Sequence, residues 1–156
     1  MNGKKNNLKV CLAASAGGHL TQLLQLWPSW ENYEVFYVTT GENIKGRIDK
    51  PGRVYTVEEC NRKNPVKLAK VFFRCMKIAL RERPDVVIST GAASGALMSY
   101  LCKMLGAKIV WMDSITNTQR LSLSGRLVRP IADLILTQWQ DIAEKYPKVE
   151  YAGQVI

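Results

Sequence analysis

Short apolar runs alternate along the chain with segments in which apolar residues recur every three or four positions. The runs suit buried strands, and the recurring positions suit helices that bury one face. This alternation is typical of a parallel sheet whose strands are joined by helices. Strands are expected at 8–14, 34–38, 53–57, 85–89, 108–112 and 133–137, with a short strand near the end of the chain.

Helices are expected between these strands. The first carries apolar residues at helical spacing from Leu20 to Trp27, and the longest spans 65–82 with Pro65 in its first turn. Others are expected from the 91–95 turn to Leu105, near 122–130, and before the last strand. The fold class is therefore α/β, a Rossmann-like doubly wound parallel sheet with its first strand in the middle.

Length and composition fit one folded domain over 1–156, since 47% of the residues are apolar and 22% are charged. The four cysteines lack CxxC spacing and the chain has one histidine, so neither a metal site nor a disulfide framework is expected. Reduced thiols suit the cytosol. The apolar run after Lys9 is too short for a signal peptide, and no stretch approaches the ~20 apolar residues that span a bilayer.

Chemistry is expected in the turns after the strands, because parallel sheets bind ligands at the carboxyl ends of their strands. The first such turn reads Ser15-Ala16-Gly17-Gly18-His19. Its glycines let the backbone approach a ligand and open a helix N-terminus, which favours an anion. The turn departs from GxGxxG, and Thr39-Thr40 rather than an acidic residue ends the second strand, so dinucleotide binding is disfavoured.

Two side chains at this edge can carry proton transfer. His19 is the only histidine, and an imidazole can accept a proton at neutral pH, although it can also form just a local hydrogen bond. Asp113 follows the strand at 108–112, where a carboxylate can orient a sugar hydroxyl or take its proton. Aspartate also caps helices and turns, so a structural role stays open.

The turn Gly91-Ala92-Ala93-Ser94-Gly95 contains only small residues and precedes a helix. It can hold a phosphate, or it can let two elements pack closely. Both alternatives place the turn at the same sheet edge as the first glycine turn.

A basic stripe runs along the helix at 65–82. Its residues are Lys67, Lys70, Arg74, Lys77 and Arg81, which fall within an arc of about 80° at about 100° per residue. Apolar residues flank the stripe, with Phe73 and Leu80 on one shoulder and Val71 and Ile78 on the other. Two apolar shoulders favour a helix lying on an anionic membrane surface, and a solvated helix whose flanks meet neighbouring helices is the alternative.

The formal net charge of +9 also indicates an anionic partner. No aromatic or basic base-reading motif accompanies the charge, so nucleic acid is not expected. The membrane surface and phosphate-bearing substrates remain as the partners that the charge favours.

Three segments together resemble the Alg14 family and its bacterial capsule and exopolysaccharide relatives. They are SAGGHLTQLL at 15–24, STGAASG at 89–95, and the whole stretch 121–156. The last is the most specific, through Leu121–Gly125, Ile131-Ala132-Asp133, Gln138-Trp139 and Lys145-Tyr146-Pro147. The resemblance runs through nearly the whole chain.

This resemblance implies the amino-terminal half of a GT-B glycosyltransferase, with the UDP-sugar bound mainly by a separate Alg13-like chain. This half would bind the lipid-linked acceptor and the membrane, and inverting transfer would need no metal or other cofactor. His19 or Asp113 would be the base for the acceptor hydroxyl. The acceptor and its phosphates are assigned to Ser15, Gly17, Gly18, Gly91, Ser94, Asn117 and Arg120.

Eukaryotic members of the family carry an N-terminal membrane helix that this sequence does not show, so the bacterial branch is favoured. That branch transfers a sugar from a UDP-sugar to an undecaprenyl-diphosphate-linked saccharide. We expect a peripheral protein on the cytoplasmic face of the cell membrane. Its partner is expected to dock at Gly153, Gln154, Val155 and Ile156, unless this tail folds back on its own sheet. The other function open to the chain is a non-catalytic scaffold that recruits and activates the partner.

Overall fold

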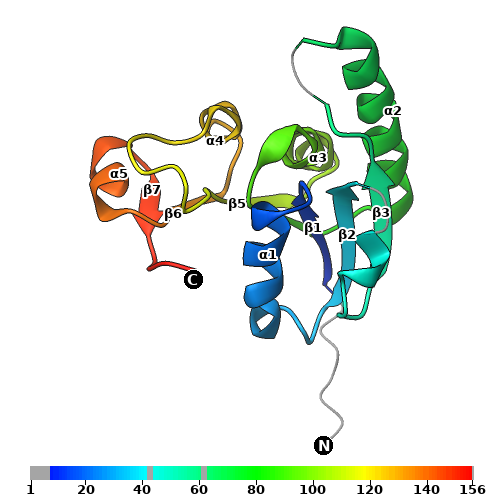
Figure 1. Cartoon of the computed structure of the whole chain (residues 1–156), viewed down its shortest axis with the longest axis horizontal. Coiled ribbons are helices and arrows are strands. Elements are labelled where there is room, and N and C mark those ends of the chain that lie inside the picture. The colour runs from blue at the N-terminus through cyan, green and yellow to red at the C-terminus, as the bar shows by residue number, and fades with distance from the viewer. Residues whose placement is uncertain (1–7, 42–43, 61–62, 156) are drawn as a thin grey trace, which may run out of the picture.

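The computed structural model describes residues 8–41, 44–60 and 63–155. They form a seven-stranded sheet in the order β3-β2-β1-β4-β5-β6-β7, and every neighbouring pair is parallel (Figure 1). The expected α/β fold with a parallel sheet is confirmed. The strands are β1 (Lys9–Ala14), β2 (Glu34–Thr40), β3 (Arg53–Val57), β4 (Val86–Ser89), β5 (Lys108–Met112), β6 (Leu134–Thr137) and β7 (Val149–Tyr151).

Five α-helices and two short 3₁₀ helices connect the described strands. The first helix ends at Gln25, so Trp27 lies outside it, contrary to the expected spacing. Trp27 instead opens a 3₁₀ turn that contains Pro28, a residue without an N–H to continue an α-helix. The helices are α1 (Gly18–Gln25), α2 (Pro65–Glu82), α3 (Ala92–Met104), α4 (Leu123–Val128), α5 (Gln140–Lys145), η1 (Trp27–Ser29) and η2 (Ile44–Gly46).

The sheet is covered unequally on its two faces. Helices α2 to α5 contribute to one core, in which Cys11, Val87 and Trp111 are fully buried. Helix α1, with the short 3₁₀ segments, covers the other face over β1 and β2, around Leu12 and Tyr37 (Figure 1).

The second face is open beyond β1. Ile88, Val110 and Leu136 are only partly buried there, and none of the described helices packs over all three. With residues 152–155 they line a cavity of about 320 Å³. An apolar sheet face that lacks a helix is a surface on which another element can pack.

The strand order reverses direction between β1 and β4. The chain moves from β1 outward to β2 and β3, then returns to β4 and continues outward on the other side. Open parallel sheets bind ligands at such a switch point, in the crevice beyond the carboxyl ends of the two strands. Here these ends lead into the turn at Ser15–His19 and the turn at Thr90–Gly95.

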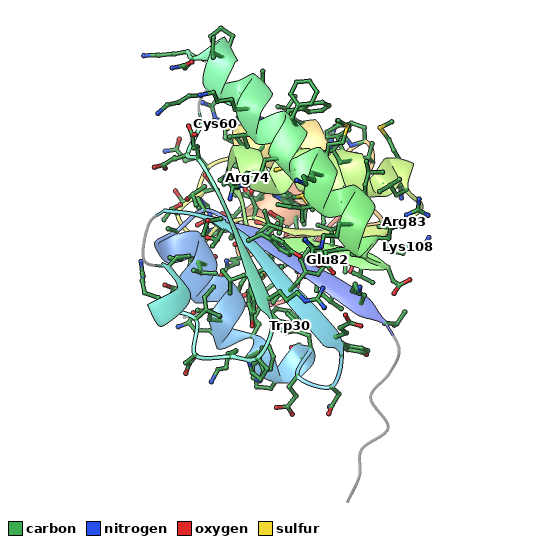
Figure 2. The ribbon with its side chains drawn as sticks, turned by 90° about the vertical axis from the view of Figure 1, so that its right-hand side faces the viewer. Trp30, Cys60, Arg74, Glu82, Arg83 and Lys108 are labelled. Atoms are coloured by element: carbon green, nitrogen blue, oxygen red, sulfur yellow. The ribbon has the colours of Figure 1, made fainter. Side chains whose placement is uncertain are left out.

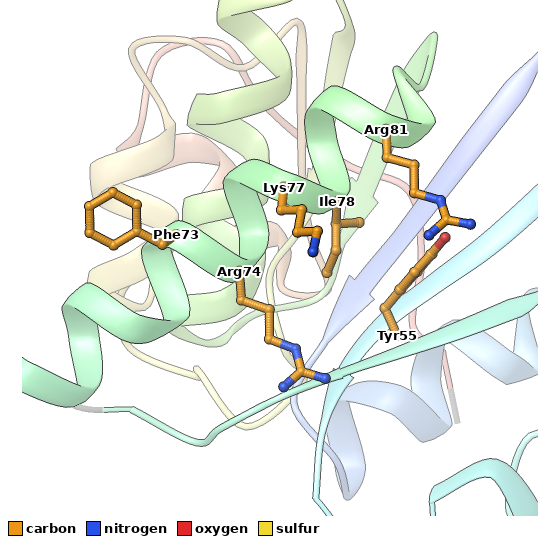
Figure 3. A pocket seen from close by; sticks show the side chains of 6 residues that line it. All are labelled: Tyr55, Phe73, Arg74, Lys77, Ile78 and Arg81. Carbon is orange, nitrogen blue, oxygen red and sulfur yellow. The ribbon is translucent and has the colours of Figure 1, made fainter.

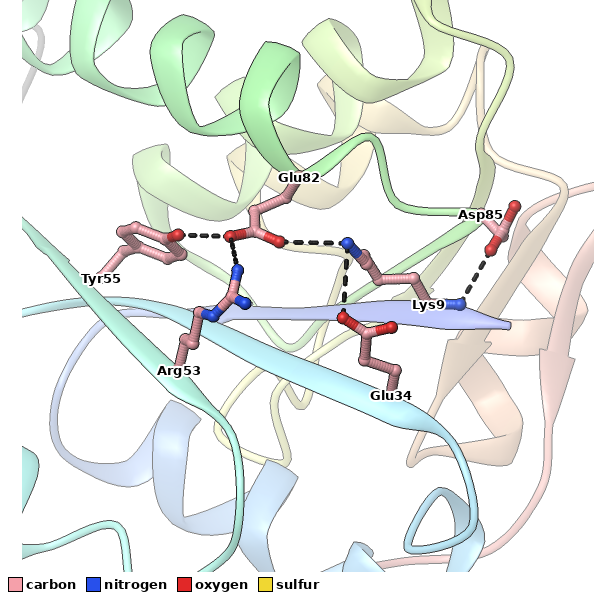
Figure 4. Close-up of polar contacts among 6 residues, drawn as sticks. All are labelled: Lys9, Glu34, Arg53, Tyr55, Glu82 and Asp85. Atoms are coloured by element: carbon pink, nitrogen blue, oxygen red, sulfur yellow. Dashed lines mark hydrogen bonds and ion pairs between the residues drawn. The ribbon is translucent and has the colours of Figure 1, made fainter. Parts of the chain in front are cut away.

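At the opposite, amino edge of the sheet, Glu82 ties α2 to the strands (Figure 4). Its carboxylate accepts from Arg53 Nη1 at 2.9 Å, from Lys9 Nζ at 3.3 Å, and from the Tyr55 hydroxyl. Burial of Glu82 opposes its ionisation, but the hydrogen bonds from Tyr55, Arg53 and Lys9 outweigh this and hold the pKa of the carboxyl below its ordinary value. This buried carboxylate therefore joins the ends of β1, β3 and α2.

Candidate functional site

Two helices begin at the switch point without side-chain caps. The N-cap residues are Gly17 for α1, with φ +98°, and Gly91 for α3, with φ +146°. Neither start has a side chain that accepts from the free N–H groups of its first turn. Unsatisfied N–H groups and the positive end of the helix dipole make each start a place for an anion.

His19 is the second residue of α1 and contacts the segment at the start of α3. The Thr90 hydroxyl donates to the carbonyl oxygen of His19 at 2.7 Å, which ties the first turn of α1 to the end of β4. The imidazole packs on Gly91, because a Cβ built there would lie 2.5 Å from Cε1 of His19. Nδ1 is buried and has no hydrogen-bond partner among the described residues. The structure thus places the two glycine turns at the same edge of the sheet, as predicted, and the part of His19, Gly17, Gly18 and Gly91 in binding or catalysis stays a prediction.

Small hydroxyl residues lie at the ends of β1 and β2 and in the first turn of α3. The hydroxyls of Ser94 and Thr39 are buried and have no partner in the part of the chain that the structure describes. Ser15 is 9% exposed at the end of β1. Thr40, which sequence reasoning used only to argue against a dinucleotide, accepts from the backbone N of Ala16 at 3.0 Å and so holds the first glycine turn. The alternation of side chains along a strand predicts that such residues lie at its end, but it does not predict which turn they contact.

The backbone at Ala92 is a site feature that sequence reasoning missed. Ala92 has φ +72°, an uncommon value for a residue with a Cβ, and it directly follows Gly91. Two successive positive φ values turn the chain sharply into α3. Strained backbone of this kind concentrates at ligand sites. An alanine gives no sequence signal for it.

Asp113 has a fully engaged carboxylate. It is 1% exposed, and it accepts from Trp111 Nε1 at 3.1 Å, from Ser122 N at 2.8 Å and from Ser122 Oγ at 2.5 Å. Ser122 in turn caps α4 by accepting from the backbone N of Gly125 at 2.9 Å. These contacts favour the structural alternative, in which Asp113 fixes the 113–122 loop. A role for Asp113 as base stays a prediction.

The remaining acceptor residues that we assigned, Asn117 and Arg120, lie in that loop. The backbone N of Asn117 donates to the carbonyl oxygen of Ser114 at 3.0 Å, and Arg120 is exposed. The Asp113–Ser122 contacts hold both ends of the loop, so Arg120 projects from an anchored segment. Their part in acceptor binding stays a prediction.

The basic residues of α2 face solvent beside the edge strand β3 (Figure 2). Val71 and Ile78 are 1% and 5% exposed, so this shoulder of the stripe belongs to the core, whereas Phe73 and Leu80 are 62% and 51% exposed. The expectation of two exposed apolar shoulders is therefore wrong, and one remains. The buried shoulder faces the sheet because a helix on a sheet must bury one side.

A groove of about 500 Å³ runs between α2 and β3. Arg74, Lys77 and Arg81 line one wall, and Tyr55 of β3 faces them (Figure 3). No acidic side chain of the described residues forms an ion pair with these three cations. Unpaired cations along one groove attract anions.

The helices next to α2 also expose apolar side chains. Helix α3 packs on both α2 and α4, and each of the three exposes large apolar side chains. Phe73 is 62% exposed, Met104 84% and Leu127 53%. Large apolar side chains exposed on packed helices make this layer a candidate interaction surface.

The described part of the predicted partner-binding tail lies beside the open sheet face. Gly153, Gln154 and Val155 line the cavity there, and Val155 N donates to Gln138 Oε1 at 2.8 Å. This contact gives the fold-back alternative a structural basis, while partner docking at the tail stays a prediction. Ile156, the fourth tail residue of that prediction, lies outside the described residues.

Cysteine chemistry at this site is disfavoured. Burial raises the pKa of the Cys11 thiol well above its usual value and those of Cys75 and Cys102 to about 12. Over the described ranges, no three His, Cys, Asp or Glu side chains gather in a way that can hold a metal ion. Within the same ranges, no helix combines the length and the apolar character that a bilayer span requires.

Comparison with solved structures supports the fold. The chain superposes on MurG of Acinetobacter baumannii with a TM-score of 0.75 at 16% identity, covering 93% of this chain and 45% of that one. For the UDP-GlcNAc 2-epimerase of Methanocaldococcus jannaschii the TM-score is 0.73 at 14% identity, covering 94% and 46%. The chain thus spans less than half the length of these proteins, and the likeness shows the fold alone.

Comparison of sequences is more specific. The chain is 26% identical over 180 residues to the UDP-N-acetylglucosamine transferase subunit ALG14 of Yarrowia lipolytica, covering 98% of this chain and 83% of the relative. It is 28% identical to the subunit of the same name from Mus musculus, covering 97% and 85%. Residues 47–155 match the family model described as oligosaccharide biosynthesis protein Alg14 like. The chain therefore belongs to the Alg14-like family of oligosaccharide biosynthesis proteins.

Proposed function

We propose that this chain is the acceptor-binding and membrane-binding subunit of a two-chain glycosyltransferase. The observation that carries the proposal is the contact of His19, in the first turn of α1, with Gly91 at the start of α3, where both helices begin without side-chain caps. Membership of a family whose relatives are named subunits of a UDP-N-acetylglucosamine transferase supports it. The enzyme would transfer a sugar from a UDP-sugar, bound mainly by an Alg13-like partner, to a lipid-linked saccharide.

Each part of the crevice has a place in this reaction. The helix starts at Gly17 and Gly91 would hold the diphosphate of the acceptor through their free N–H groups. A hydroxyl of the acceptor attacks the anomeric carbon, a new glycosidic bond forms, and the bond to UDP breaks. His19 takes the hydroxyl proton and UDP leaves with the electron pair of the broken bond, so the sugar is transferred with inversion. The buried, unpartnered Nδ1 indicates that the ring is held by packing rather than by a local hydrogen bond.

The further details that we propose follow the bacterial branch of the family. The acceptor is an undecaprenyl-diphosphate-linked saccharide, and the product enters capsule or exopolysaccharide synthesis. The chain works as a peripheral protein on the cytoplasmic face of the cell membrane. A non-catalytic scaffold that recruits and activates the partner is the second candidate, and the fully bonded Asp113 favours it, because one of the two candidate bases is already engaged.

Substitution of His19 separates catalysis from scaffolding. We expect His19→Ala in the two-chain complex to lower kcat by about 10²-fold or more, because a general base contributes on this order. Transfer from radiolabelled UDP-sugar to lipid-linked acceptor is measured, with the melting temperature and partner pull-down of each variant. Gln25→Ala, an exposed change in the same helix, is the matched control and should leave kcat unchanged. Near-normal turnover of His19→Ala would support the scaffold and reject the base.

The outer layer of α2, α3 and α4 is the proposed membrane surface. It combines exposed apolar side chains with the basic stripe, which suits insertion at the headgroup boundary of an anionic bilayer. Phe73, Met104 and Leu127 would enter the apolar boundary, and the groove cations would lie among lipid phosphates. The loss of one apolar shoulder on α2 is offset by the exposed side chains of its neighbours.

Charge reversal on α2 tests this surface. Each basic residue near an anionic membrane contributes about 1 kcal/mol, so Lys70→Glu with Arg74→Glu should weaken binding by more than tenfold. The measurement is cosedimentation with vesicles that contain phosphatidylglycerol. Arg47→Glu with Lys145→Glu changes the net charge equally at exposed positions outside α2, α3 and α4. Equal weakening by both pairs would show that only net charge matters, and it would remove α2 from the binding surface.

The tail beside the open sheet face is the proposed docking site of the partner. Deletion of 154–156 should raise the dissociation constant for an Alg13-like partner by at least tenfold, because apolar burial at a docking site is lost. Pull-down and melting temperature are measured together. The melting temperature should fall slightly, since the deletion also removes the hydrogen bond between Val155 and Gln138. Retained pull-down would reject docking at this site.

A further inference from the structure

The side-chain amide of Gln138 joins three segments that are far apart in the sequence. Gln138 directly follows β6 and is 1% exposed. Its Nε2 donates to Gln22 Oε1 of α1 at 3.1 Å and to the carbonyl oxygen of Asp113 at 3.1 Å. Its Oε1 accepts from the backbone N of Val155 at 2.8 Å.

The polarity of the backbone groups fixes the orientation of this amide. The N–H of Val155 can only donate and the carbonyl of Asp113 can only accept, so the oxygen and nitrogen of Gln138 cannot be exchanged. The atom of Gln22 that faces Nε2 is then its oxygen. Glutamine supplies the buried donors and the acceptor that this junction needs, whereas neutral leucine supplies none and ionised glutamate supplies no donor.

The three segments are those that form the candidate site and its docking tail. Gln22 lies on α1, within one turn of His19, and is itself 7% exposed. Asp113 begins the loop that carries Asn117 and Arg120. Val155 belongs to the segment beside the open sheet face. A shift of the tail therefore changes the hydrogen bonding of a buried group that also holds α1.

We propose that Gln138 is a positioning residue that couples the place of the tail to the place of His19. The proposal rests on the proposed function only in that the tail is where the partner docks. When the tail moves away, Oε1 of Gln138 loses the backbone N–H that it accepts from, and the amide is free to rotate toward another donor. Its bond to Gln22 is then lost and the first turns of α1, which carry His19, shift. Docking at the tail in this way controls the order of the acceptor crevice.

One histidine in the chain makes the test direct. The full-length chain without a histidine tag, with ¹³C-labelled histidine, gives a single Cε1–H peak, which reports only on His19. Val155→Pro removes the N–H that donates to Gln138, while Val155→Ala retains it and serves as the control. We expect Val155→Pro to move the peak and Val155→Ala to leave it in place. Amide protons of α1 should exchange about tenfold faster in Val155→Pro, as on loss of one buried hydrogen bond.

A second pair of variants shows whether Gln138 carries the coupling. Gln138→Leu should move the peak, and adding Val155→Pro to it should give no further change. Gln140→Leu, on α5, makes the same substitution at an exposed position and should leave the peak unmoved. If Val155→Pro moves the peak equally in the wild-type chain and in Gln138→Leu, the tail does not act on His19 through Gln138, and the proposal is rejected. The proposal is also rejected if Val155→Pro folds and its His19 peak does not move from the wild-type position. That comparison does not need Gln138→Leu, so it holds even if Gln138→Leu does not fold.

The outcome is independent of the proposed function, because the measurement needs neither partner nor substrate. Coupling within the single chain can be absent while His19 still serves as base, and the kinetic effect of His19→Ala would show that. Conversely, if the peak moves in Val155→Pro and His19→Ala has normal turnover, the coupling is supported and the role of His19 as base is rejected.

Discussion

Replacement of Glu82 by alanine is expected to lower the free energy of unfolding by about 3 kcal/mol, a large part of the stability of one domain. The side chain of Glu82 is 2% exposed and accepts from groups of both β1 and β3. Its removal leaves the Tyr55 hydroxyl without its acceptor beneath α2, and it leaves a cavity. Urea denaturation followed by circular dichroism measures the loss.

The neighbouring Glu34 provides a control in the same cluster. Its side chain is 60% exposed and lies 3.3 Å from Lys9 Nζ. An exposed ion pair contributes little, so Glu34→Ala should cost less than about 1 kcal/mol. Equal losses for the two variants would show that burial of Glu82 is not what makes its contacts strong.

The same carboxylate predicts how stability depends on pH. Its pKa is lower in the folded chain than in the unfolded chain, so the stabilisation is fully present above the unfolded value, about 4.3. It is lost as the pH falls through the folded value. Wild type should therefore lose stability more steeply than Glu82→Gln below about pH 4–5, and the two denaturation midpoints should approach each other. Asp133, whose pKa is lowered by Lys103 and by the backbone N–H of Ile109, titrates in both proteins and cancels in this comparison.

Gly91→Ala is expected to lower transfer at least as far as His19→Ala, by about 10²-fold or more. Gly91 has φ +146°, which a residue with a Cβ rarely adopts, and the new Cβ would lie 2.5 Å from Cε1 and 2.7 Å from Nδ1 of His19. The imidazole must leave the crevice or α3 must begin elsewhere. The measurement is kcat of the two-chain complex, with the His19 NMR peak as a structural readout.

Gly106→Ala separates this clash from backbone strain. Gly106 has φ +94°, but a Cβ there would meet no atom within 4 Å. It should cost about 1–2 kcal/mol of stability and leave kcat unchanged. If Gly91→Ala retains full activity, the packing of His19 on Gly91 has no role in transfer.

Most of the sheet could be predicted from the sequence because each strand is a short apolar run bounded by turn residues. The run at 53–57 matches β3 (Arg53–Val57), and the helix at 65–82 matches α2 (Pro65–Glu82). Asn64 accepts from the backbone N of Lys67 and Pro65 follows it, so the start of α2 is encoded locally. The two glycine turns were placed at one edge because parallel strands end together.

The parts that could not be predicted depend on contacts between distant segments. Helical spacing showed apolar residues on both flanks of the basic stripe but not which flank meets the sheet, so Val71 and Ile78 were assigned to the surface. Asp113 was equally suited to a base and a cap, and only its contacts with Trp111 and Ser122 favour the cap. The junction at Gln138 joins residues 116 positions apart, and no local pattern predicts it.

The Glu82 cluster and the His19 crevice lie at opposite ends of the same strands, which has a consequence for engineering. Six residues of β1 separate the two edges, a span of about 20 Å at about 3.3 Å per residue. Substitutions that far apart, with no shared partners, contribute to stability almost additively. Substitutions at the amino edge can therefore raise the stability of the fold without changing the site around His19. Stability gained there can offset the loss from substitutions at the carboxyl edge that change which acceptor is bound.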